Sequence, residues 1–141
     1  MAAPFLGWNG DVLKKILATT DGSERAYRAV SFASGLAEKY GAVLSLVHIR
    51  SDGAAAPDTV RKQAEDARAE LVVLEDERPA EAICRYAEEA DIDAIVLGNY
   101  GMKERKQFLM SNVPNRVSHN APCSVIIVDT RDEAWKKRAK R

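Results

Sequence analysis

The segment Ala94-Ile95-Val96-Leu97-Gly98-Asn99-Tyr100-Gly101 predicts a buried strand that runs into a glycine-containing loop. An uninterrupted apolar run is typical of a strand covered on both faces. The glycine pair indicates a loop whose backbone approaches another group closely. After nine more residues, the polar pair Ser111-Asn112 marks the start of a helix. Strand, glycine turn and helix start together predict a phosphate-binding loop, because the first N–H groups of a helix bind anions.

Apolar runs of this kind recur along the chain and alternate with helical patterns. Lys14–Thr20 predicts a strand that is ended by the turn residues Asp21-Gly22-Ser23. Apolar side chains then recur at helical spacing from Ala26 to Tyr40. The predicted strands are 14–20, 42–49, 70–74, 93–97 and 123–128, and the predicted helices are 26–40, 57–68, 79–90 and 113–120. This order predicts an α/β fold, a doubly wound parallel sheet of five strands with helices on both faces.

The composition and the first residues of the chain indicate which classes of binding partner to exclude and which cellular compartment to expect. The 141 residues include 21 Lys and Arg and 21 Asp and Glu, so the net charge is zero. We therefore expect neither nucleic acid nor an anionic membrane as a partner. The first residues lack the basic and apolar regions of a signal peptide, which predicts a cytoplasmic protein. Cys84 and Cys123 lack metal-ligand spacing, and we expect both to be reduced and no metal site.

Three regions are expected along the chain. Residues 1–13 form an N-terminal extension, and residues 14–129 form one domain. Residues 130–141 form a tail that is rich in Arg and Lys, and we expect this tail to be mobile and solvated.

Two features converge on one ligand site. Parallel doubly wound sheets bind ligands beyond the carboxyl ends of the strands, where the winding direction reverses. If the fourth strand lies beside the first, Asp21 and Gly98 face each other across that crevice. A carboxylate there can accept hydrogen bonds from ribose hydroxyls, while the glycine turn and the helix start can donate N–H groups to phosphates. Taken alone, Asp21 could equally be a turn residue, and the glycines could serve conformation only.

Several segments together resemble the universal stress protein family. Lys14–Ser23 is similar to the opening of the family, and Asp93–Gly101 is similar to its fourth strand and loop. Val113–Val125 is very similar to its closing segment, and the resemblance extends over about residues 14–128. It implies the adenine nucleotide alpha hydrolase-like fold, with the sheet order 3-2-1-4-5.

The resemblance also implies a nucleotide site, because one branch of the family binds ATP through the pattern G-x-x-G-x9-G-(S/T). Gly98 and Gly101 match its first two glycines, and Asp21 matches an acidic residue that contacts ribose. Ile49 matches a position whose backbone contacts adenine, and Val113 matches one that offers an N–H to phosphate. The implied nucleotide-binding residues are Thr20, Asp21, Ile49, Gly98, Gly101, Ser111, Asn112 and Val113.

Two positions depart from the family pattern. Ser111 stands where the third glycine is expected, and Asn112 stands where Ser or Thr is usual. If the backbone at position 111 needs positive φ, serine costs about 1 kcal/mol in strain; if it needs only room, the cost is small. Asn112 can still donate hydrogen bonds and cap a helix.

These observations leave two functions open. The first is a stress-response module that binds ATP, ADP or AMP, with Mg²⁺ as an accompanying ion, and acts through homodimer contacts and contacts with an unknown protein partner. The alternative is a dimeric interaction protein that keeps the fold but binds no nucleotide. Because no nucleophile–base pair is evident, we expect no enzyme and at most slow incidental ATP hydrolysis. The resemblance also implies a homodimer through the apolar fifth strand, which would otherwise be an exposed edge.

Overall fold

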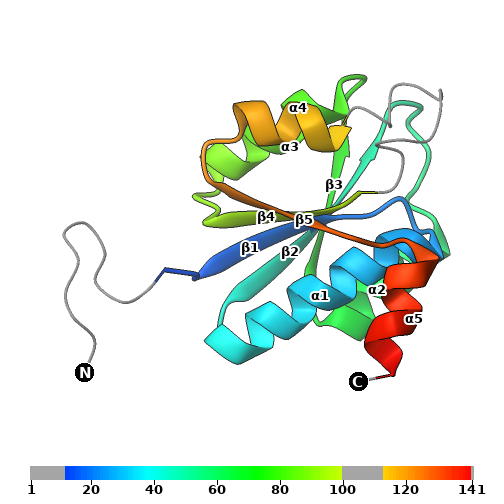
Figure 1. The fold of residues 1–141 in the computed structure, drawn as a ribbon. Coiled ribbons are helices and arrows are strands. Elements are labelled where there is room, and N and C mark those ends of the chain that lie inside the picture. Colours follow the sequence, from blue (N-terminus) through cyan, green and yellow to red (C-terminus); the bar gives the residue numbers. More distant parts are fainter. Residues whose placement is uncertain (1–11, 100–112, 141) are drawn as a thin grey trace.

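The computed structural model describes residues 12–99 and 113–140 of the chain. Strands and helices alternate as expected (Figure 1). The elements are β1 Lys15–Thr19, α1 Glu24–Tyr40, β2 Val43–Arg50, α2 Asp58–Ala67, β3 Glu70–Glu75, α3 Pro79–Glu89, β4 Ala94–Gly98, α4 Val113–Asn120, β5 Ser124–Val128 and α5 Asp132–Ala139. In the described part of the chain, no helix is long and apolar enough to cross a membrane.

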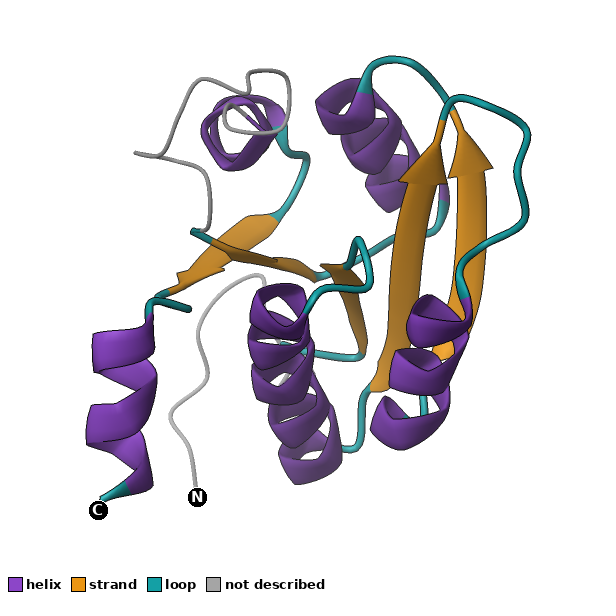
Figure 2. Ribbon diagram, turned by 90° about the vertical axis from the view of Figure 1, so that its right-hand side faces the viewer, coloured by secondary structure: helices purple, strands orange, loops and turns teal. Residues whose placement is uncertain are grey.

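The five strands form one sheet in the order β3-β2-β1-β4-β5, and each neighbouring pair is parallel. The predicted fold class and strand order are therefore confirmed. β1 lies at the centre, where Leu17 is opposite Ser45 of β2 on one side and Ile95 of β4 on the other. The winding direction reverses at this central strand. The sheet twists strongly from one edge to the other, as strand sterics require (Figure 2).

Two apolar clusters cover the two faces of the sheet. Because neighbouring residues of a strand point to opposite faces, Ile16 and Ala18 belong to one cluster and Leu17 to the other. The first cluster packs against α1 and α2, and the second packs against α3 and α4 (Figure 1). All three of these β1 side chains are fully buried, so the central strand is fixed from both sides.

Helix α1 begins and ends where the sequence provides caps. Ser23 accepts a hydrogen bond from the N–H of Ala26, which satisfies one of the free donors at the helix start. Gly41 ends the helix in the left-handed region at φ 66°. The buried face consists mainly of alanines, which lets the helix approach the sheet closely.

The C-terminal segment differs from the prediction of a mobile tail, because Asp132–Ala139 forms the helix α5 beside α1. Arg28 of α1 holds its start: the guanidinium lies 2.8 Å from the Asp132 carboxylate and donates to the Thr130 carbonyl at 2.8 Å. It also lies over the Trp135 ring, 5.6 Å from the centroid. The acidic first turn and basic last turn of α5 complement the helix dipole.

Candidate ligand-binding crevice at the carboxyl edge of the sheet

The carboxyl ends of β1 and β4 lie side by side at the point where the winding reverses. The register pairs Ile16 with Ala94 and Ala18 with Val96. Two further residues along each strand bring the chain to Thr20 and Gly98. The structure thus brings together the ends of the two strands that the sequence singled out, and we take the described residues at the end of each strand as one wall of the candidate crevice. We call these segments the β1 wall, Thr20–Ser23, and the β4 wall, Gly98–Asn99.

The β1 wall is held by a buried polar network. Thr20 is only 6% exposed; its hydroxyl donates to Gln63 Oε1 and accepts from the N–H of Gly22 at 2.9 Å. The amide of Gln63 in turn donates to the Ser23 carbonyl at 3.0 Å. His48 Nδ1 lies 3.0 Å from the Thr20 carbonyl oxygen, and because that oxygen can only accept, Nδ1 donates. The Thr20 side chain is therefore committed to holding the turn.

Asp21 is the exposed member of this wall. Its Oδ1 accepts a hydrogen bond from the N–H of Ser23 at 2.9 Å, which is a turn contact of the kind that aspartate commonly makes. Within the described residues, Oδ2 has no hydrogen-bond partner. The carboxylate is thus anchored by one oxygen while the other can accept from a ligand.

In the β4 wall, Gly98 leaves little room for a side chain. A Cβ atom at this position would lie 3.0 Å from the Thr130 methyl group and 3.6 Å from the Ala29 Cβ. The close approach that the sequence predicted therefore exists, but the approaching atoms belong to the protein itself. The same glycine also ends β4, opposite Val128 of β5.

Asn99, which sequence reasoning did not select, fastens this wall to the segment after β5. Its Oδ1 accepts from the N–H of Thr130 at 3.0 Å and from the Thr130 hydroxyl at 3.2 Å, while Nδ2 donates to Asp129 at 3.2 Å. Arg131 binds the Asp129 carboxylate through two nitrogens, at 2.8 and 2.6 Å. The hydrogen bonds from Arg131 hold the pKa of Asp129 well below its usual range. The feature of the sequence that could have indicated this role is the polar run Asp129-Thr130-Arg131, which directly follows β5.

The remaining predicted residues divide between the described and undescribed parts of the chain. Ile49 is half-buried near the end of β2, on the face covered by α3 and α4. Val113 opens α4, and its side chain is 7% exposed in the same cluster. Its backbone N–H is one of the helix-start donors that lack an intrahelical acceptor. Gly101, Ser111 and Asn112 lie outside the described residues.

Possible metal and thiol chemistry is limited in the described residues. These contain no group of three or more His, Cys, Asp or Glu side chains that could hold a metal ion. Cys84 and Cys123 are free thiols, and burial raises the pKa of both. Both side chains pack against the apolar cluster under α3 and α4, which gives them a packing role.

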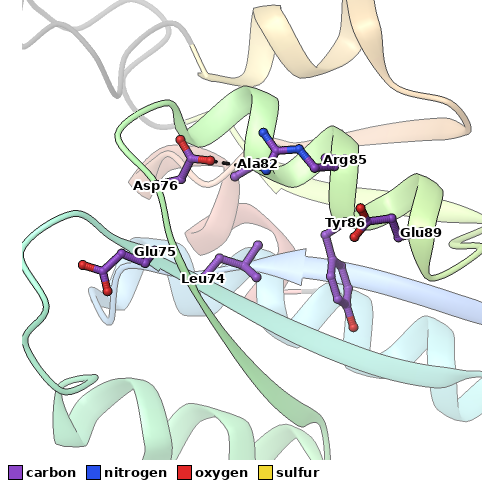
Figure 3. Close-up of a pocket in the computed structure, with 7 residues that line it drawn as sticks. All are labelled: Leu74, Glu75, Asp76, Ala82, Arg85, Tyr86 and Glu89. Carbon is purple, nitrogen blue, oxygen red and sulfur yellow. Dashed lines mark hydrogen bonds and ion pairs between the residues drawn. The ribbon is translucent and has the colours of Figure 1, made fainter.

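A small pocket of about 90 Å³ lies elsewhere, between the end of β3 and α3 (Figure 3). Arg85 and Asp76 form an ion pair across it at 3.4 Å. Hydrogen bonding from the N–H of Arg78 is the main cause that lowers the pKa of Asp76. Ligand pockets for drug-sized molecules are several times larger, roughly 300–1,000 Å³, so this pocket does not accommodate a nucleotide. The crevice between the β1 and β4 walls is the candidate site.

The parallel sheet with the order β3-β2-β1-β4-β5 and the likeness to solved structures define an α/β protein of the adenine nucleotide alpha hydrolase-like class. A model of the universal stress protein family matches residues 13–72 and 53–129. The chain belongs to the universal stress protein family.

Individual relatives agree with this assignment. A universal stress protein of Thermus aquaticus is 32% identical, over 83% of this chain and 99% of the relative. One of Methanocaldococcus jannaschii is 28% identical, over 85% of each chain. A crystal structure of a universal stress protein in complex with cAMP is 27% identical and has a TM-score of 0.71, covering 84% of this chain and 98% of that one.

Proposed function

We propose that the chain is a stress-response module that binds an adenine nucleotide in the crevice between the β1 and β4 walls. The observation that carries the proposal is the state of Asp21. Its carboxylate is exposed at the strand end where the winding reverses, and only one oxygen is used by the turn. An exposed, anchored carboxylate at the carboxyl end of β1, beside β4, suits a ribose that carries vicinal hydroxyls.

The other parts of the nucleotide are assigned to the remaining predicted residues. The backbone at Ile49 would contact adenine, and the N–H groups from Gly101 to Val113 would bind phosphates. The burial of the Val113 side chain supports this role, because it fixes the start of α4 while the helix-start N–H groups stay unpaired within the helix. The cAMP complex of a relative supports the ligand class. Mg²⁺ would accompany ATP or ADP through the phosphates.

One observation favours the alternative, a protein that keeps the fold without binding nucleotide. Gly98 packs tightly against Thr130, so a glycine there serves the fold whether or not a phosphate is bound. Ser111 in place of the third family glycine points the same way. The proposal therefore rests on Asp21 and the start of α4, and the experiment has to separate the two functions.

Direct detection of the ligand separates them. The purified protein is extracted with acid, and any released nucleotide is identified by chromatography. In parallel, ATP, ADP, AMP and cAMP are titrated with and without Mg²⁺ by calorimetry and thermal shift. Saturable binding of at least one of them supports the proposal. Absence of bound nucleotide and of any response at millimolar ligand overturns it in favour of the alternative.

A matched pair of variants places the ligand. Asp21→Asn keeps the Oδ1 acceptor of the turn and removes the charge, so we expect roughly tenfold weaker binding with little loss of stability. Asp91→Asn makes the same chemical change at the opposite edge of the sheet, where φ is 55° and asparagine is well tolerated. The control should bind like the wild type. Equal affinity of all three proteins would remove Asp21 from the site.

Assembly and hydrolysis complete the proposal. β5 is an edge strand of the sheet, and Ile127 on it is 38% exposed. We propose a cytoplasmic homodimer that pairs along this edge and hydrolyses ATP slowly or not at all. Sedimentation of the wild type and of Ile127→Lys tests the assembly, since a charge on an edge strand opposes pairing.

A phosphate-release assay that shows many turnovers per minute would contradict the absence of enzymatic activity.

A further inference from the structure

Gln63 of α2 is a buried polar side chain whose two amide atoms are both used on the β1 wall. It is 9% exposed. Its Oε1 accepts from the Thr20 hydroxyl, and its Nε2 donates to the Ser23 carbonyl at 3.0 Å. The two contacts lie on either side of Asp21 in the chain. One side chain from a distant helix therefore pins the residue before Asp21 and the second residue after it.

The first turn of α2 confines the same segment from a second direction. Gly22 has φ 90°, a conformation that side chains of L-residues rarely adopt. A Cβ atom there would lie 2.5 Å from Thr59 Oγ1 and 3.3 Å from a Val60 methyl group. The Gly22 N–H also donates to the Thr20 hydroxyl at 2.9 Å. The backbone around Asp21 thus has little freedom, and α2 supplies the restraint.

The chemistry at position 63 is specific to an amide. The site needs one acceptor for the Thr20 hydroxyl and one donor for the Ser23 carbonyl on the same group. A methionine would fill the space but supply neither. A glutamate would turn an oxygen toward the Ser23 carbonyl and lack the donor. Because an apolar residue would satisfy core packing alone, the amide points to a requirement for a fixed turn.

We propose that Gln63 is a positioning residue for the nucleotide site: it fixes the β1 wall so that the Asp21 carboxylate meets the ribose hydroxyls. This inference rests on the proposed function. A site built to hydrogen-bond a hydroxyl discriminates against the analogue that lacks it, provided the bonding group is held in place. Gln63 thereby sets the preference of the site for ribonucleotides over deoxyribonucleotides.

The test measures this preference rather than affinity alone. Dissociation constants are determined for ATP, 2′-deoxy-ATP and 3′-deoxy-ATP with the wild type and with Gln63→Met. We expect the wild type to prefer ATP over at least one analogue by roughly tenfold. Gln63→Met should reduce that ratio to about twofold or less, since the carboxylate is no longer held toward the hydroxyls.

Two controls separate positioning from general damage to α2. Ala64→Gly, on the next residue, weakens the helix while the Gln63 hydrogen bonds to the β1 wall keep their donors and acceptors, and it should keep the ratio of the wild type. In the Asp21→Asn background, Gln63→Met should cause no further loss of preference, because Gln63 acts through Asp21. If Gln63→Met does not fold, Thr20→Val removes the same hydrogen bond from the other side and should lower the ratio likewise.

The outcomes distinguish this inference from the proposed function. If the wild type binds no adenine nucleotide, the proposed function fails. If the wild type binds ATP and its deoxy analogues equally, or if Gln63→Met keeps the preference, the positioning role is wrong while nucleotide binding stands. A further drop of preference when Gln63→Met is added to Asp21→Asn also overturns it, because Gln63 would then act by another route.

Discussion

The two walls of the crevice differ in which part of the molecule supplies the contacts that hold them in place. The β1 wall is fixed by α2, a helix later in the chain, through the amide of Gln63 and the close approach of Thr59 to Gly22. The β4 wall is fixed by the last strand of the sheet, because Asn99 binds Asp129 and Thr130 after β5. The restraining side chain of the β1 wall comes from another element, Gln63 of α2. The restraining side chain of the β4 wall is its own Asn99. Rigidity on the ribose side therefore depends on α2, while the β4 side depends on the C-terminal segment.

The largest effect is expected from Gly22→Ala on the β1 wall. The substitution forces an alanine into φ 90° and pushes its Cβ to 2.5 Å from Thr59 Oγ1. Strain of the left-handed conformation and overpacking together should lower the free energy of unfolding by about 3 kcal/mol, measured by urea denaturation.

Gly41→Ala is the matched control for Gly22→Ala. Its φ is 66°, but a Cβ there meets no atom within 4 Å. Only the conformational part remains, so we expect a loss of about 1 kcal/mol. Thr59→Ala should recover part of the loss in Gly22→Ala by removing Oγ1. Equal losses for the two glycine variants would mean that α2 does not press on the β1 wall.

The next effect is Asn99→Ala on the β4 wall. It leaves the N–H and the hydroxyl of Thr130 without their acceptor, and Thr130 is 0% exposed. An orphaned buried donor is costly, so we expect a loss of about 2 kcal/mol in the free energy of unfolding. Asn120→Ala removes an exposed asparagine that donates to the Arg116 carbonyl and should change stability by less than about 0.5 kcal/mol. If both variants are equally mild, the β4 wall is held by strand pairing alone.

The contrast between the walls also explains what the sequence could predict. The parallel sheet could be predicted from unbroken apolar strands and capped helices, because hydrophobic periodicity and helix caps are local features of the sequence. The close approach at position 98 was predicted correctly, but its partners Thr130 and Ala29 could not be, since they lie far away in the chain. Gln63 lies in the predicted helix 57–68, where no local signal distinguishes it from the other polar residues. The Gln63 side chain is buried because of the position at which α2 packs against the sheet, and no local sequence pattern determines that position.

The helix in the C-terminal segment was not predicted for the same reason. A basic run without a long apolar face is typical of a solvated tail. Its anchor is Arg28, a residue of α1 more than a hundred positions earlier, which contacts Asp132 and Trp135. Thr130 is buried, and its methyl group packs closely against Gly98. These are pairings between single residues, and they become visible only in three dimensions.

A smaller effect concerns the charge at the base of the β4 wall. The Arg131 hydrogen bonds lower the pKa of Asp129 in the folded state, so its contribution to stability is full above the ordinary aspartate pKa of about 3.9. That contribution is lost as the pH falls toward the lowered folded pKa. Asp129→Asn should therefore cost at most about 1 kcal/mol at pH 7, because the pair is partly exposed to solvent.

Urea denaturation across pH tests the sign of this contribution. The difference between the wild type and Asp129→Asn should be constant from pH 7 to about 5 and shrink as the pH is lowered below about 4. Arg131→Met removes the partner and should give a similar difference at pH 7. If the difference in the free energy of unfolding between the wild type and Asp129→Asn stays the same down to pH 3, the destabilisation comes from packing and not from the carboxylate charge.

The smallest effect is expected at the outer end of the β4 side, with Trp135→Ala in α5. The ring is half-buried and stacks on Arg28, an interaction worth about 0.5–1 kcal/mol at exposed sites. α5 buries no residue fully, so its loss should release the helix without loosening Asn99 and Thr130. Hydrogen exchange should accelerate in residues 132–139 and stay unchanged at residue 130. Lys136→Ala, on an exposed neighbouring position, should leave both regions unchanged. If Trp135→Ala instead accelerates exchange at Thr130, the β4 wall extends into α5, and the C-terminal helix has to be counted as part of the crevice.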